Sequence, residues 1–199
     1  MPTRAEKLRR ANRAMRREVQ AFNVRVDAEV REQLTNLDGG VSCTKGCAGC
    51  CRQLTVTTSA EAQNIVESYP NLVRQHLPAF EAQDKALEAI AAAQGLPPEL
   101  TNETRTALSN EWWLQGHSCA FLANGLCTIY AQRPIACRTY FVRSDPALCH
   151  DPEVGRAVDV VQPRALLTGF AHLLQVGARH GDASVAALPT AILHAWKRH

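Results

Sequence analysis

VSCTKGCAGCC, residues 41–51, is the stretch that organises this chain, and we call it the first cysteine block. It places four of the eight cysteines within nine residues, with glycines at positions 46 and 49 between them. A disulfide framework suits it poorly, because Cys50 and Cys51 are adjacent and a bond between neighbours is strained. The turn Cys47-Ala48-Gly49-Cys50 can instead supply two thiolates to one metal ion, since glycine permits the backbone angles that curl a chain around it.

A second cysteine block, CAFLANGLCTIYAQRPIACRTYF, occupies residues 119–141. Its Asn-Gly pair at 124–125 indicates a hairpin turn between two short apolar pieces. A two-residue loop would pair Leu122 with Cys127 and turn Cys119 to the opposite face, whereas a three-residue loop would bring both cysteines to one face. If both serve one centre through a regular hairpin, we therefore expect the three-residue loop.

Charged residues and a proline surround the last cysteine of this block. Pro134 suits the first position of a short helix, which would place Cys137 where the helix dipole favours a thiolate. Arg133 and Arg138 flank Cys137, and Lys45 lies within the first cysteine block. We expect their positive charge to offset the thiolates, or their N–H groups to donate hydrogen bonds to the sulfurs.

Together the two blocks resemble the YkgJ-type cysteine-cluster family, a zinc- or iron-chelating domain named for its CxxCxxCC motif. The similar residues span 43–138 and include Gly-x-Cys, Ile-Tyr and Arg-Pro-x-x-Cys-Arg. The first gap here holds three residues rather than two, which the family tolerates. The family is mostly of unknown function, so the resemblance implies a metal domain without implying a reaction. The candidate metal ligands that it implies are Cys43, Cys47, Cys50, Cys51, Cys119, Cys127 and Cys137.

Three further residues are weaker candidates. Cys149, followed by His150, lies beyond the similar motif, and it suits a buried small apolar residue as well as it suits a ligand. His117 precedes Cys119 by two residues and could replace a thiolate, because imidazole also suits zinc. We favour a surface histidine for His117.

Thiolate-only ligation admits one four-cysteine zinc site, two such sites, or a 4Fe-4S cluster. The cysteine spacing does not decide between these three kinds of metal site. The run Cys43-x3-Cys47-x2-Cys50 resembles the cluster motif of radical S-adenosylmethionine enzymes, and flagellin lysine methylases carry a similar motif. An iron–sulfur-dependent enzyme of methyl-transfer or radical type is therefore the alternative. The chain shows no alternating β/α pattern and no glycine-rich nucleotide turn. We favour a metal-binding protein with a structural or metal-handling role and assign no catalytic residue.

Helical periodicity covers most of the remaining chain and predicts a mostly α fold, with the cysteines on loops and one short hairpin. Thr3 with Glu6, and Thr58 with Glu61, are capping boxes that begin helices. A strand is expected at 54–57. The expected helices are 3–37, 58–69, 71–94, 99–114, 163–179 and 189–197.

These elements suggest three parts: an N-terminal amphipathic helix at 1–40, a metal-binding domain at 41–150, and C-terminal helices at 151–199 that pack on that domain. The apolar stripe of the first helix must lie on the rest of the domain or on a protein partner. Its start is rich in arginine, which could meet RNA or an anionic membrane. We favour an ordinary solvated face.

Composition limits the remaining classes. With 46% hydrophobic residues among 199, the chain can bury a core. No apolar run reaches the roughly 18–20 residues of a membrane span, and the basic start lacks the apolar segment of a secretory signal. We therefore expect a cytoplasmic protein, with a mitochondrial presequence at 3–17 as the minor alternative. Four thiolates with one divalent ion carry −2 and lower the formal charge from +3 to +1, so the charge does not indicate nucleic-acid binding.

Overall fold

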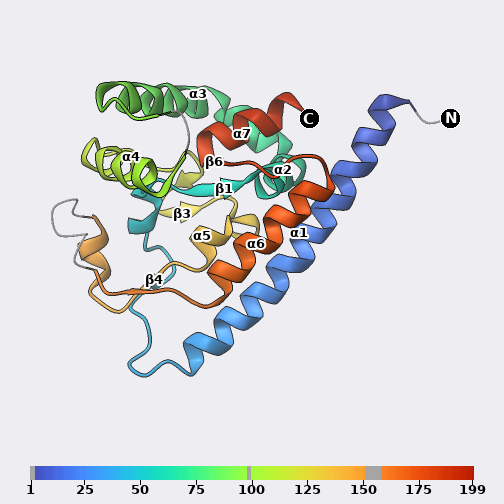
Figure 1. Ribbon diagram of the computed structural model, residues 1–199. Helices are drawn as coiled ribbons and strands as arrows, with labels where there is room; N and C mark the ends of the chain where they lie inside the picture. Colours follow the sequence, from blue (N-terminus) through green and yellow to red (C-terminus); the bar gives the residue numbers. More distant parts are fainter. Residues whose placement is uncertain (1–2, 98–99, 151–157) are drawn as a thin grey trace.

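The computed structural model describes residues 3–97, 100–150 and 158–199, and helices dominate it (Figure 1). This confirms the mostly α fold. The short strands form three separate antiparallel pairs, and no larger sheet occurs within the described residues.

The long N-terminal helix α1 (Arg4–Thr35) begins with the expected capping box. The Thr3 backbone N–H donates to the Glu6 carboxylate at 2.7 Å, and the Glu6 N–H donates to Thr3 Oγ1 at 3.2 Å. Each side chain thereby satisfies a backbone donor that has no partner inside the helix.

The middle of α1 lies along the body of the protein, beside α6 (Ala165–Arg179) (Figure 1). Its apolar stripe is buried there with Ile135 and Leu173. The chain itself therefore covers this part of the stripe, while Leu8 near the N-terminal end is 48% exposed. The buried members of the stripe are Met15, Val19, Phe22, Val26 and Val30.

A second apolar core lies between α2 (Ser59–Ser68), α3 (Pro70–Ala93) and α7 (Leu188–Lys197). The boundaries agree closely with those expected from the capping box at Thr58 and the proline at 70. Phe121 and Ile129 of the second cysteine block are buried in the same core. Burying these two side chains fixes the cysteine-bearing loop to the helices.

A third cluster forms where α4 (Asn102–Leu114) packs beside α3. Trp112 is buried there with Leu54, Leu87 and Ile90. Leu54 lies three residues after the end of the first cysteine block, so this cluster anchors the segment that leaves the block.

One strand pair joins two segments that lie far apart in the sequence. β1 (Val56–Thr58) pairs antiparallel with β6 (Val185–Ala187), and Leu188 N–H extends the contact to Thr55 O at 2.8 Å. The expected strand at 54–57 is therefore present one or two residues later. β6 was not predicted, because three residues are too few for a period of two to be read.

The hairpin differs from the conditional expectation. β2 (Leu122–Ala123) and β3 (Leu126–Cys127) are joined by a two-residue loop, and Leu122 pairs with Cys127. The three-residue loop is wrong because the hairpin is not regular as far as Cys119. The Leu122 N–H donates to Cys119 O at 3.0 Å, so the chain turns before β2 begins.

A third strand pair and three short 3-10 helices complete the fold. β4 (Phe141–Val142) pairs antiparallel with β5 (Val160–Val161). The 3-10 helices are Gly49–Arg52, Tyr130–Gln132 and Pro146–His150. Within the described ranges, no helix combines the length and the apolar character needed to cross a membrane.

Candidate metal centre

The first cysteine block is a series of tight turns. The Cys47 N–H donates to Thr44 O at 3.1 Å, and Gly46 between them has a φ of +93°, which a side chain would resist. The Cys51 N–H donates to Ala48 O at 3.0 Å and leads into the 3-10 helix that carries Cys50 and Cys51. These turns compress four thiols into a short stretch of backbone.

The fold brings the second block against the first. The Cys119 N–H donates to Cys51 O at 2.7 Å across the 67 intervening residues. Behind Cys119, Phe121 enters the apolar core. The two blocks are therefore neighbours in space, as the single-centre hypothesis requires.

Cys137 arrives from a third direction, on the short helix α5 (Ile135–Arg138). Pro134 is its N-cap rather than its first residue, one position from the expected place. The thiol of Cys137 lies 3.5 Å from Thr55 Oγ1, just after the first block. Burial raises the pKa of Cys137, and the neighbouring thiols of Cys119, Cys50 and Cys127 raise it further.

The thiols divide into two sets by the neighbours that influence them. In the first set, burial raises the pKa of Cys43, and the thiols of Cys47 and Cys50 raise it further. Burial likewise raises the pKa of Cys149 to about 11, and the thiols of Cys47, Cys43 and Cys50 add to the shift. Cys149 thus belongs with the first block in space, although it follows the second in sequence.

The second set contains Cys51, Cys119, Cys127 and Cys137. Burial raises the pKa of Cys119 to about 11, with a further contribution from Cys127. The pKa of Cys51 is raised because its thiol is hydrogen-bonded to Cys50, and burial, Cys119 and Cys137 raise it further. A group of thiols that oppose one another's ionisation favours binding of a cation that neutralises them.

Cys50 is the thiol that the two sets share. It influences the pKa of cysteines in both sets. Its own pKa is lowered to about 7, chiefly by the hydrogen bond with Cys51 and also by the charge of Arg133. The hydrogen bond between the two thiols therefore favours the thiolate of Cys50, which lies at the junction of the two sets.

Backbone N–H groups point at several of these sulfurs. The Val142 N–H donates to Cys43 Sγ at 3.4 Å. The N–H groups of Phe121 and Ile129 favour the thiolates of Cys119 and Cys127 and lower their pKa values against the effect of burial. Such N–H donors to sulfur accompany thiolate metal sites, so this chain's donor set fits a thiophilic metal.

The sulfurs of the two blocks do not converge on one point within the described residues. Across the described part of the chain, no three or more His, Cys, Asp and Glu side chains have the arrangement that would hold an ion. Neutral thiols gain little free energy by converging on one point, whereas a bound ion would attract their thiolates and draw them together. The blocks are adjacent, and binding one ion through several of these thiols would require their side chains to rotate toward it.

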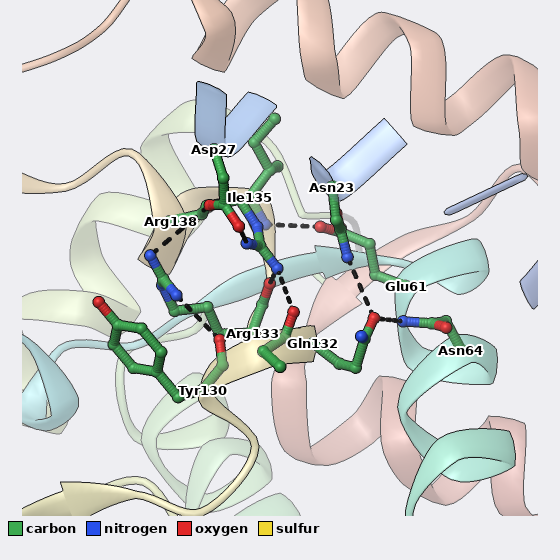
Figure 2. A network of polar contacts seen from close by, with 10 residues as sticks. Asn23, Asp27, Glu61, Asn64, Tyr130, Gln132, Arg133, Ile135 and Arg138 are labelled. Carbon is green, nitrogen blue, oxygen red and sulfur yellow. Dashed lines mark hydrogen bonds and ion pairs between the residues drawn. The ribbon is translucent and has the colours of Figure 1, made fainter. Parts of the chain in front are cut away.

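A buried polar network holds the second block in place (Figure 2). Glu61, at the start of α2, is only 2% exposed, and its Oε1 accepts from the Ile135 N–H at 2.6 Å. Gln132 Oε1 accepts from Asn64 at 2.9 Å and from Asn23 of α1 at 3.3 Å. The 3-10 turn before Cys137 and the first residue of α5 are thereby fixed to both α1 and α2.

Arg138 completes the network from within the protein. Its side chain is fully buried, pairs with Asp27 of α1 and donates to the carbonyls of Ala131 and Arg133 (Figure 2). None of these contacts of Arg138 is to a sulfur, so hydrogen bonding to sulfur, one of the two roles expected of the flanking cations, is not seen for Arg138. Arg133 does offset thiolate charge, since it lowers the pKa values of Cys50 and Cys127.

The histidines take other positions. His117 stacks on Trp112 with ring centroids 4.3 Å apart, and its Nε2 lies 3.2 Å from Gln115 Oε1. His150 is exposed. Cys149 is buried, as one of its two expected roles requires, and its close contact with Gly49 could not be read from the sequence.

That contact supports a prediction. A β-carbon at Gly49 would lie 2.5 Å from Cys149 Cβ and 3.3 Å from its carbonyl, so Gly49→Ala must push the two segments apart. We expect a loss of about 1–3 kcal/mol in the free energy of unfolding, measured in urea. In a double-mutant cycle, Cys149→Gly should recover part of that loss. Unchanged stability in Gly49→Ala would show that the two segments are not packed in this way.

The comparisons with known proteins agree with this reading. The family model described as "CxxCxxCC: Putative zinc- or iron-chelating domain" matches residues 42–153. This range covers more than half of the 199-residue chain and contains every cysteine. Searches of curated proteins and of solved structures found no match.

Proposed function

This chain belongs to the CxxCxxCC family, and from that membership we propose that it binds zinc or iron through the thiolates of its two cysteine blocks. The candidate ligands are the seven cysteines named from the sequence, and Cys149 joins them. The bound metal would tie loops from distant parts of the chain into one core, in a structural or metal-handling role. Closing such long loops costs entropy, which ligation offsets.

The observation that carries this proposal is the contact between the blocks. The Cys119 N–H···O Cys51 hydrogen bond brings them together, and the thiols on either side raise one another's pKa values. Eight thiols exceed the four that one mononuclear site needs. Two zinc ions, one for each set with Cys50 and Cys51 at the junction, would use all of them. A 4Fe-4S cluster would use four and leave structural or redox cysteines beside it.

We further propose that residues 41–150 form the metal domain, with 1–40 and 151–199 packed on it. Support comes from the buried clusters that α1 and α6 share with α5, and that α7 shares with α2 and α3. A cytoplasmic location suits this function, because clustered thiols stay reduced there.

Anaerobic purification of the full chain, followed by metal analysis and a visible spectrum, tests the function. We expect zinc or iron in stoichiometric amount. Stoichiometric zinc with thiols protected from modification would support a structural module. A brown protein with iron and sulfide would support the cluster, and a spectral change on adding S-adenosylmethionine would support the enzyme alternative instead.

A colourless protein without stoichiometric zinc or iron would contradict the proposal. A chelator provides the second arm of the experiment. Because ligation offsets loop entropy, the chelated chain should unfold at lower urea concentration than the loaded one. Equal stability with and without chelator would argue against a structural role.

A further inference from the structure

A pocket of about 430 Å³ opens beside the polar network, between the C-terminal half of α1 and the turn that precedes α5. This volume lies within the range of small-molecule sites. Neither the cysteine motif nor the family description accounts for it. Its walls include Val30, Arg31, Leu34, Tyr130, Arg133 and Phe141.

The walls of the pocket divide by chemistry. Val30, Leu34 and Phe141 contribute apolar surface, and Tyr130 contributes a ring that is 64% exposed. Arg31 and Arg133 supply positive charge. The combination suits a molecule with an apolar body and an anionic end.

The positive charge exceeds the negative charge at this place. Asp27 also lines the pocket, but its carboxylate already pairs with Arg138 and lies 3.9 Å from Arg133 Nη2 (Figure 2). In the described part of the chain, the guanidinium of Arg31 has no hydrogen-bond or ion-pair partner. Among the described residues, one cation of the pocket therefore has no anion to pair with.

The Arg133 guanidinium is positioned to donate hydrogen bonds into the pocket. Its guanidinium carbon lies 3.8 Å from the centre of the Tyr130 ring, and its Nη1 donates to Tyr130 O at 2.8 Å (Figure 2). A guanidinium has five N–H donors, so several remain for a ligand. Stacking and the carbonyl contact fix its plane, which reduces the entropy lost when a carboxylate binds in bidentate fashion.

We propose that this pocket binds a small organic carboxylate, with its carboxylate between Arg31 and Arg133 and its apolar body against Leu34, Phe141 and the Tyr130 ring. This goes beyond the proposed function and requires no metal. The pocket nevertheless adjoins the centre, because Arg133 also acts on the thiols of Cys50 and Cys127. A bound anion would sit beside the metal-binding loops.

Two probes of one shape test the proposal. Calorimetric titration of the full chain with 4-phenylbutyrate should show saturable binding, and the neutral amide 4-phenylbutanamide should bind at least about tenfold more weakly because it lacks the charge. Arg31→Gln removes the unpartnered charge from an exposed position and should weaken 4-phenylbutyrate binding about two- to fivefold.

Arg17→Gln is the matched control. It removes the same charge from an exposed position on the same helix, about four turns away, and should leave binding unchanged. Three results would overturn the proposal: no saturable binding of 4-phenylbutyrate at millimolar concentration, equal binding of the amide, or equal weakening by Arg31→Gln and Arg17→Gln. None of these measurements depends on metal content, so this proposal can fail while the proposed metal-binding function stands.

Discussion

Replacing Cys50 with alanine is expected to remove most of the bound metal, whereas replacing Cys43 is expected to remove only part of it. Cys50 lies where the two sets of thiols meet, and it influences cysteines of both. The hydrogen bond with Cys51 also lowers the pKa of Cys50 to about 7 and favours its thiolate. Cys43 acts on the thiol of Cys149 in the first set, so Cys43→Ala leaves the second set and the shared Cys50 thiol in place, whereas Cys50→Ala removes a thiol next to both sets.

The measurement is metal per chain after anaerobic purification, with the number of protected thiols counted in parallel. For Cys50→Ala we expect metal content below about a tenth of the wild type, as for loss of a ligand shared by neighbouring sites. Ser118→Ala is the control, because it alters an exposed side chain next to Cys119 without removing a thiol. If Cys50→Ala kept full metal content, Cys50 would not be a ligand and the two sets would not share it.

Local chemistry allowed much of the fold to be predicted from sequence. Capping boxes need only residues three positions apart, and both predicted boxes, at Thr3 and Thr58, are present. Helix boundaries followed from proline and glycine for the same reason. The pairing of β4 with β5, or of β1 with β6, depends on contacts between distant segments, and strands of two or three residues show no readable period.

The candidate site shows the same limit. Seven cysteines could be named from spacing and resemblance, because short loops with glycine carry their own geometry. Cys149 could not be ranked, because its place beside the first block depends on its packing against Gly49. Glu61 looked like an ordinary helix cap, and its second role, accepting the Ile135 N–H, arises only when α2 meets α5.

Replacing Glu61 with glutamine is expected to cost about 2–4 kcal/mol in the free energy of unfolding. Its Oε1 accepts from the Ile135 N–H at 2.6 Å, and its Oε2 accepts from Thr58 N–H, Thr58 Oγ1 and Thr57 Oγ1 at 3.0, 3.0 and 3.1 Å. A carboxamide has one oxygen and one NH₂ group, so its NH₂ would lie against an N–H or O–H group that also donates. The carboxyl is 2% exposed, and water is not at hand to compensate.

The comparison should use chelated wild type and variant in urea, with Glu88→Gln, an exposed change on α3, as the control that should alter stability by less than about 0.5 kcal/mol. If Glu61→Gln lowered the free energy of unfolding by less than about 0.5 kcal/mol, the carboxyl would not hold α5 to α2.

The pH dependence of the free energy of unfolding supplies a second readout with a definite sign. Burial raises the pKa of Glu61 above its usual value, although the N–H groups of Thr58 and Ile135 oppose the shift.

The folded protein therefore keeps a proton on Glu61 at pH values where the unfolded chain has already released it. Its free energy of unfolding must then fall as pH rises from the usual carboxyl pKa through the raised one, by up to about 1.4 kcal/mol per pH unit. Glutamine does not titrate, so the deficit of Glu61→Gln should be largest in acid and should narrow across this window. A deficit that widened with rising pH would mean that the hydrogen bonds to the carboxylate outweigh its burial. In that case the fixing of Cys137 through Ile135 would depend on a charged Glu61 rather than a protonated one.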